Sequence, residues 1–170
     1  MATAWQITAL ESGLTLLQAD ATLSTYVDDF SIASRYRPAT IPGMTRHAIQ
    51  LIPGATEARP GTVKRNLEQF TIRVRLVIKV WDPTDEDAIL LARTVVGIGT
   101  STVGFLQFAE DVKNAVRKQE LTGLAEETAI EADAIPDISQ VPNEAHDEIF
   151  YESSLNWNLL RVAYHEAALR

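Results

Sequence analysis

The chain has 170 residues, 46% of them apolar and none of them cysteine, so it can bury a core without disulfide bonds. Its formal charge of −8 and pI of about 4.8 argue against a protein that grips nucleic acid through a basic domain. The sequence shows neither a signal-peptide pattern nor a run of about 18 apolar residues, which favours a soluble single domain over residues 1–170 made without export.

Basic and acidic residues are segregated along the chain. Residues 35–79 hold nine Lys or Arg and two acids, whereas residues 119–160 hold ten acids and no basic residue. This separation favours attraction between the two regions, within one subunit or between neighbouring subunits. The alternative is that each region forms an independent solvated surface.

The N-terminal part predicts a helix over residues 3–18, followed by a short capped turn of helix. Ile7, Leu10, Leu14 and Leu17 recur at helical spacing, and Thr3 is available as the N-cap. Residues 28–37 then show a modest strand pattern. Residues 47–52 predict a short strand, and the polar residues 54–65 predict an extended hairpin tip that projects from the sheet.

The strongest pattern is a long strand over Leu67–Trp81. Its odd positions include Arg73, Arg75 and Lys79, while its even positions are apolar, so one face is expected to lie on the core. The even positions that we assign to the core are Phe70, Ile72, Val74, Leu76 and Ile78.

A helix is expected after Asp82, because an acidic, proline-containing cap follows the strand. The stretch GIGTSTVG at residues 97–104 interrupts it, and a second helical pattern follows from Phe105 to Val116. We therefore expect two helices or one interrupted helix. The interruption is interpreted as a kink or an inserted turn.

The acidic residues 119–147 predict a segment that wraps the surface. Residues 149–169 predict a final strand, whose apolar parity changes at Leu159 and Leu160. A β-bulge, or the end of one pairing partner, would produce such a change. Together the elements predict an α+β fold: a small twisted, mostly antiparallel sheet with a long central strand, flanked by an N-terminal helix and a long or interrupted helix after that strand.

No constellation of residues predicts catalysis, a cofactor site or a metal site. His47, His146 and His165 lack the spacing of metal ligands on one helix face. Gly97, Gly99 and Gly104 lack the spacing and the lysine of a nucleotide-binding loop. We therefore expect a protein that is not an enzyme.

Three stretches carry a resemblance to a known family: ALESGLTLLQADATLSTYVDD near the N-terminus, IKVWDPTDEDA, and FAEDVKNAVRK. They resemble the tail terminator, tail completion and tail-to-head joining proteins of long-tailed bacteriophages. The resemblance implies a virion protein, assembled in the host cytoplasm, that forms a ring at the head-proximal end of the tail. It implies no cofactor and no catalysis.

The partners that this resemblance implies are further copies of the chain in a hexameric ring, the tail tube protein, and a head connector or head-closure protein. DNA would pass through the channel without specific binding, and no membrane is involved. Two alternatives stay open: another neck component, such as a head-closure or adaptor protein, and a small enzyme or ligand-binding module. The residues that we expect at a subunit or tail-tube interface are Arg59, Lys64, Arg65, Arg73, Arg75 and Lys79.

Overall fold

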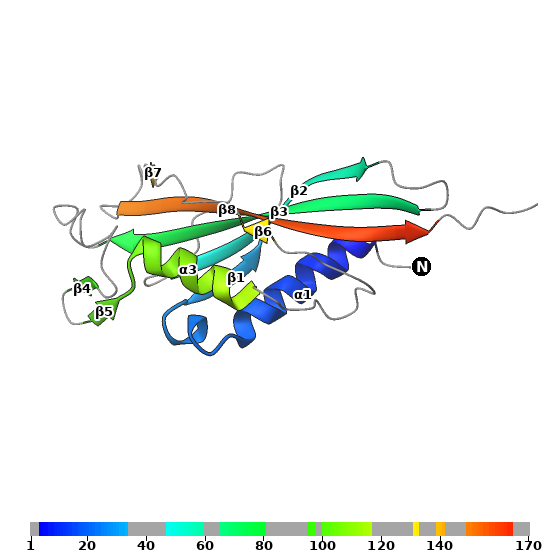
Figure 1. The fold of residues 1–170 in the computed structure, drawn as a ribbon. Coiled ribbons are helices and arrows are strands. Elements are labelled where there is room, and N and C mark those ends of the chain that lie inside the picture. The colour runs from blue at the N-terminus through cyan, green and yellow to red at the C-terminus, as the bar shows by residue number, and fades with distance from the viewer. Residues whose placement is uncertain are drawn as a thin grey trace, which may run out of the picture.

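The computed structural model describes residues 4–33, 47–59, 65–80, 95–97, 100–116, 131–132, 139–141 and 149–164. Within them, helices α1 (Trp5–Ala19) and α3 (Phe105–Val116) lie on the same side of a mixed, mostly antiparallel sheet, as Figure 1 shows. The expected α+β class is confirmed.

The main sheet has six strands in the order β1-β2-β3-β8-β6, and β7 pairs with β8 beside β6. β1 is parallel to β2, and all the other pairs are antiparallel. The strands are β1 (Asp29–Ile32), β2 (His47–Arg59), β3 (Arg65–Val80), β6 (Glu131–Ala132), β7 (Ser139–Val141) and β8 (Ile149–Tyr164).

The long central strand is confirmed as β3, whose 16 residues span roughly 50 Å. It pairs with β8 from Arg65 opposite Tyr164 to Val80 opposite Ile149 without a register shift. A bulge at Leu159 in this pairing is therefore wrong. Among the described residues, β6 pairs with Trp157 and Asn158 of β8, and the alternative explanation, the end of a pairing partner, stays a prediction.

The even face of β3 is the core, as its pattern predicts. Phe70, Ile72, Val74, Leu76 and Ile78 are all at most 3% exposed. The buried side of α3 packs in the same cluster, as do Leu155, Trp157 and Leu159 of β8. The buried residues of α3 are Phe105, Phe108, Ala109, Val112, Ala115 and Val116.

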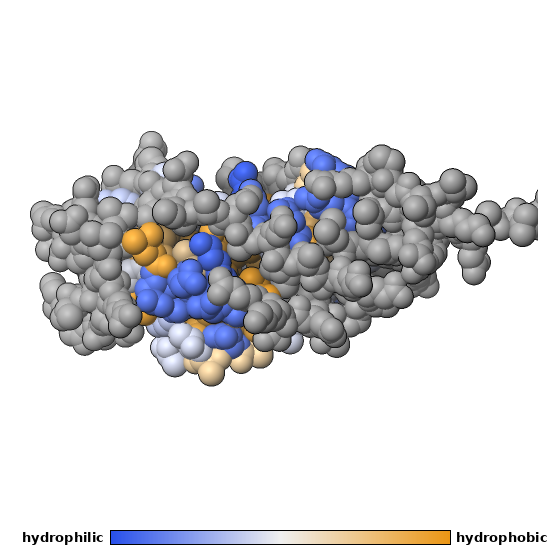
Figure 2. Space-filling view, viewed as in Figure 1, coloured by the Kyte–Doolittle hydropathy of each residue, from blue (hydrophilic) through white to orange (hydrophobic). Residues whose placement is uncertain are grey.

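On the outward side of α3, Glu110 and Asn114 are exposed, and so is Leu106 near the start of the helix. Figure 2 shows hydrophilic residues over this helix on the face in view. The opposition of a polar and an apolar side is what fixes α3 on the sheet.

The inward face of α1 differs from the expected one. Leu10 and Leu17 are buried and Leu14 is partly buried, but Ile7 is 47% exposed. The helix turns small residues to the sheet instead: Ala9 and Gly13 are buried. A Cβ on Gly13 would lie 2.8 Å from the Trp157 ring, so the missing side chain is what allows this close approach. The N-cap is Ala4 without a side-chain hydrogen bond, not Thr3.

The capped turn after α1 is confirmed as a short 3₁₀ helix, η1 (Leu23–Thr25). The Asp20 carboxylate accepts hydrogen bonds from the backbone N–H groups of Thr22 and Leu23, each at 2.9 Å. This cap starts the turn that leads the chain into β1.

The second strand is longer than its sequence pattern predicts. Residues 54–59, expected in the hairpin tip, continue β2 and pair with β3 as far as Arg59 opposite Leu67. The register shifts between Pro53 and Thr56, and a Cβ on Gly54 would lie 2.5 Å from the Thr71 carbonyl oxygen. Pro and Gly thus mark a β-bulge here and not the start of a loop. Residues 60–64 of the tip lie outside the described residues.

The interrupting stretch also differs. Residues 95–102 contribute the two strands of a small antiparallel hairpin, β4 (Val95–Gly97) and β5 (Thr100–Thr102), and not a helix kink. The β-branched residues Val95, Val96, Thr100 and Thr102 favour the extended conformation of these strands. The helix expected after Asp82 falls on residues 82–94, outside the described residues.

The close contact of α1 with Trp157 yields a prediction. Gly13→Ala would stabilise an exposed helix by about 1 kcal/mol. Here the new methyl meets a buried indole ring, and overpacking costs about 1–3 kcal/mol. We therefore expect a net loss of about 1 kcal/mol in the free energy of unfolding, measured by urea denaturation. Glu11→Ala, at an exposed position of the same helix, is the control and should change it little. Stabilisation by Gly13→Ala would contradict the close packing.

Candidate functional site

The predicted interface residues occupy two places on the sheet. Arg59 ends β2 and Arg65 begins β3, so both lie at the hairpin end. Lys64 lies outside the described residues. Arg73, Arg75 and Lys79 share the face of β3 that is opposite the helices, because alternate residues of a strand point to the same side.

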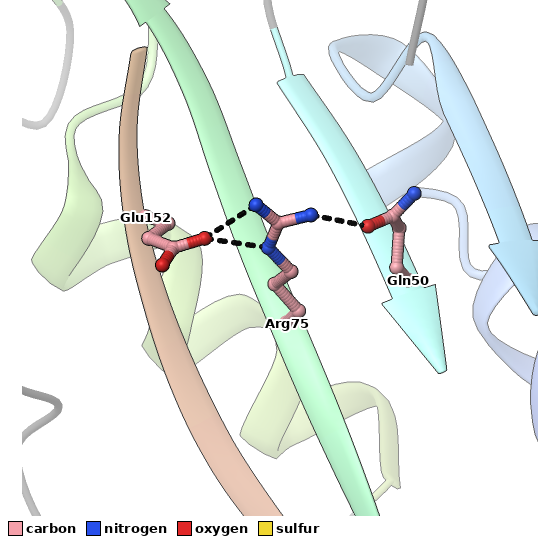
Figure 3. Close-up of polar contacts among 3 residues, drawn as sticks. All are labelled: Gln50, Arg75 and Glu152. Atoms are coloured by element: carbon pink, nitrogen blue, oxygen red, sulfur yellow. Dashed lines mark hydrogen bonds and ion pairs between the residues drawn. The ribbon is translucent and has the colours of Figure 1, made fainter. Parts of the chain in front are cut away.

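Arg75 is at the centre of a polar group that spans three strands (Figure 3). Its Nε and Nη2 atoms contact one carboxylate oxygen of Glu152 in β8, at 2.6 and 2.5 Å. Its Nη1 donates to the Gln50 side-chain oxygen in β2 at 2.8 Å. Gln50 and Arg75 are 5% and 9% exposed. A buried guanidinium that is bonded on both sides ties the three strands together.

The guanidinium of Arg75 is bonded inside the subunit, and its expected place at an interface stays a prediction. Within the described residues, the predicted attraction between the basic and acidic regions is present at the pair Arg75–Glu152, since Glu152 is among the ten acids. Glu152 belongs to β8, however, and not to the acidic segment 119–147. That segment contributes β6 and β7 to the edge of β8, and its other residues lie outside the described residues.

This face of the sheet is apolar at one end. Val77 is fully buried with Ala48 and Phe150 in a second, small cluster. Arg73, four residues before Val77, is exposed, and its register partner Asn156 is exposed too. The face thus changes along β3 from a buried end near Val77 to an open end near Arg73. Of the basic residues that we assigned to this face, Arg73 is the one that the structure leaves exposed.

A second group, which sequence reasoning missed, surrounds His47 at the start of β2. Its ring Nε2 lies 2.6 Å from the Val103 carbonyl oxygen, and the Tyr26 and Phe108 rings meet it edge-on at 5.1 Å. The Tyr26 hydroxyl donates to the Asp111 carboxylate at 2.8 Å, and Gln107 donates to the other oxygen. These contacts join η1, β2 and α3.

Burial raises the pKa of the Tyr26 phenol well above its usual value, and the hydrogen bond to Asp111 acts in the same direction. The negative charges of Asp111 and Asp20 add to this effect. The chain separates Tyr26 and Asp111 by 85 positions. The sequence signal that could have revealed this group is His47, a single histidine in an otherwise apolar strand.

The described residues include no group of three His, Asp or Glu side chains that could hold a metal ion. His146 and His165 lie outside them. No helix in the described ranges is long and apolar enough to cross a membrane. The described side chains thus form one polar group across three strands, Gln50, Arg75 and Glu152, which we call the polar tie. Exposed Arg73 lies beside it on the same face of β3.

No protein-family model matches the chain, and no curated protein matches it significantly.

The pKa of Tyr26 implies a pH dependence of stability. An unfolded tyrosine ionises near pH 10, whereas the folded protein holds Tyr26 neutral above that pH. The contribution of neutral Tyr26 to the free energy of unfolding is therefore complete below about pH 10, and it is lost as the pH rises further. Tyr26→Phe should cost about 1 kcal/mol at pH 7 and flatten the fall in unfolding free energy above pH 10. Tyr151→Phe controls for loss of a phenol elsewhere. An unchanged alkaline slope would contradict this.

The polar tie also yields a prediction. Arg75→Met should lower the free energy of unfolding by about 1–3 kcal/mol, because it leaves Gln50 and Glu152 without their shared donor. The upper end is discounted because the Glu152 side chain is about one third exposed. The double variant Arg75→Met/Glu152→Met should lose less than the sum of the two single variants. Additive losses in urea denaturation would show that the pair is not coupled.

Proposed function

We propose that the protein is a structural virion subunit that forms a ring, a hexamer by resemblance, at the head-proximal end of a phage tail. The ring ends growth of the tail tube and offers the surface that joins tail to head. Its partners are copies of itself, the tail tube protein and a head connector or head-closure protein, and DNA passes through its channel. The proposal starts from the three stretches that resemble tail terminator and tail-to-head joining proteins.

The observation that best supports an assembly role is the projecting arm, formed by Thr56–Arg59 of β2, Arg65–Gln69 of β3 and Leu160–Tyr164 of β8. Phe70 of β3 is buried, Gln69 and Glu68 before it are partly buried, and the arm continues the backbone pairing beyond them. Figure 1 shows β3 and β8 extending past α1. A sheet that is longer than the helices packed on it can present strand edges and faces to other molecules.

Exposed Arg73 adds a second element. Arg73 lies at the exposed end of this sheet face. Residues 119–147 carry most of the acidic side chains of the region without basic residues. An acidic segment of a neighbouring subunit that meets Arg73 would help to hold a ring together. Carboxylates left over would line a channel from which DNA phosphates gain little affinity.

The experiment adds the purified protein to phage tails that assemble without their terminator. We expect negative-stain images to show a ring at the head-proximal end and tails of uniform length. Rings on portals instead of tails would favour a head-closure protein, and the absence of rings on either structure would contradict the proposal.

Within this assay, Arg73→Glu should leave the fold intact, because the side chain is exposed, and should reduce ring formation more at low salt than at high salt. Arg73→Lys keeps the charge and is the matched control. Equal ring formation by wild type and Arg73→Glu at low salt would remove Arg73 from the interface.

A further inference from the structure

Helix α1 presents an apolar and an acidic side chain together on the side that is turned away from the sheet. Ile7 is 47% exposed, and Glu11, one helical turn later, is exposed too. Residues four positions apart on a helix have Cβ atoms about 5–6 Å apart. The residues of α1 that face the core, Ala9, Gly13 and Leu17 among them, lie on its other side. We call the pair Ile7 and Glu11 the helix surface.

The face of the sheet opposite the helices carries a pair of the same kind. Arg73 of β3 is exposed, and its register partner in β2 is Ile52, which is partly buried. Directly opposite residues of an antiparallel pair point to the same face, with Cβ atoms about 4.5–5.5 Å apart. Towards β8, Arg73 is flanked by Ser154 and Asn156, both exposed and uncharged. We call the pair Ile52 and Arg73 the sheet surface.

The two surfaces match in charge and in spacing. The helix surface has an acid and an isoleucine about 5–6 Å apart, and the sheet surface has a base and an isoleucine about 4.5–5.5 Å apart. When Glu11 faces Arg73, Ile7 can therefore face Ile52. An exposed ion pair contributes little to affinity, but it sets the register of a contact, and the apolar pair removes two side chains from water.

Glu11 is also the acid that is left after the others are considered. The exposed acids of the described residues are Glu11, Asp28, Glu57 and Glu110. Asp28 and Glu110 have interactions within the subunit. Glu57 pairs with Gln69, which places it on the same face as Arg73, so a contact between opposite faces cannot bring the two together. No ion pair of Arg73 or Glu11 lies within the part of the chain that the structure describes.

One copy cannot form this contact by itself. α1 lies so close to the sheet that a Cβ on Gly13 would be 2.8 Å from the Trp157 ring, which is part of the core on the helix side. Glu11 is exposed on the outer side of that helix. Arg73 is on the opposite face of β3, because its neighbours Ile72 and Val74 are the residues that face the core. The sheet and the helix layer therefore separate the two charges, and a partner for Arg73 on α1 must belong to another copy.

We propose that the helix surface of one copy docks on the sheet surface of a second copy, with Glu11 paired to Arg73 and Ile7 packed on Ile52. The two surfaces differ and lie on opposite sides of the subunit, so the contact is head-to-tail. Repeated, it closes into a ring if the rotation between copies allows, and otherwise extends as a filament. The inference rests on the proposed function for its setting in a ring, and it assigns the partner of Arg73 to α1 of the neighbouring subunit.

The absence of cysteine from the chain makes disulfide trapping a clean test. Ile7→Cys/Ile52→Cys keeps both charges, and it is oxidised mildly at low salt, both as concentrated protein and after addition to tails that lack a terminator. We expect a ladder of covalent multimers on a non-reducing gel, which a reductant collapses to monomer. Mixing the two single-cysteine variants should give dimers and no larger species.

The matched control is Leu106→Cys/Ile52→Cys, which moves the first cysteine to an exposed apolar position of α3. An equal ladder from this control would overturn the assignment to α1. The absence of a ladder from Ile7→Cys/Ile52→Cys, in solution and on tails, would overturn the contact itself. Equally strong dimers from each single-cysteine variant alone would show a two-fold contact and would also overturn it.

Charge reversal in the trapping variant tests the ion pair. Arg73→Glu or Glu11→Arg alone should lower the yield of multimers at low salt at least about tenfold, because each brings two like charges together. Both reversals in one chain restore the attraction and should restore the yield. The replaced side chains are exposed, and circular dichroism checks that each variant is folded. A double reversal that stays as poor as the single ones would overturn the pairing.

Two results separate this contact from the tail role. A loss of multimers with Arg73→Glu but not with Glu11→Arg would assign Arg73 to other acids, which overturns the contact with α1 and leaves the proposed function standing. A ladder that follows the charge reversals, from a protein that never binds tails, would support the contact and contradict the proposed function.

Discussion

The structure depends on the pairing of β3, with β8 along its whole length on one side and with β2 from Leu67 to Ile78 on the other. This pairing holds a 16-residue strand extended over a distance that a single helix cannot cover. Its even residues bury the core against α1 and α3. Its odd residues are left to a second face that no described helix covers, and that face ranges from the buried Val77 to the exposed Arg73.

Two local contacts stabilise this pairing: the hydrogen bonds of Arg75 and the packing of Gly13 on Trp157. The Arg75 guanidinium bonds Glu152 and Gln50, so the strands on both sides of β3 share one charge-assisted tie. Gly13 lets α1 approach Trp157, which seats the helix against the middle of the sheet. Both contacts act at the central part of β3, and the arm beyond Phe70 carries the sheet past them. That division into an anchored body and a projecting arm suits a subunit that is built to meet other copies.

The sequence by itself determined the elements whose signal is local. The alternation along Leu67–Trp81 fixed both the strand and its core face, and the apolar spacing of Phe105–Val116 determined the buried side of α3, because burial of one face imposes the period of the structure. Tertiary structure decided what depends on distant neighbours. Gly13 faces the Trp157 ring while Ile7 is exposed, and Pro53 and Gly54 form a bulge because β3 continues beside them. Arg75 is bonded inside the subunit because Glu152, 77 positions away, reaches it. Each of these outcomes depends on a partner that the local pattern does not contain.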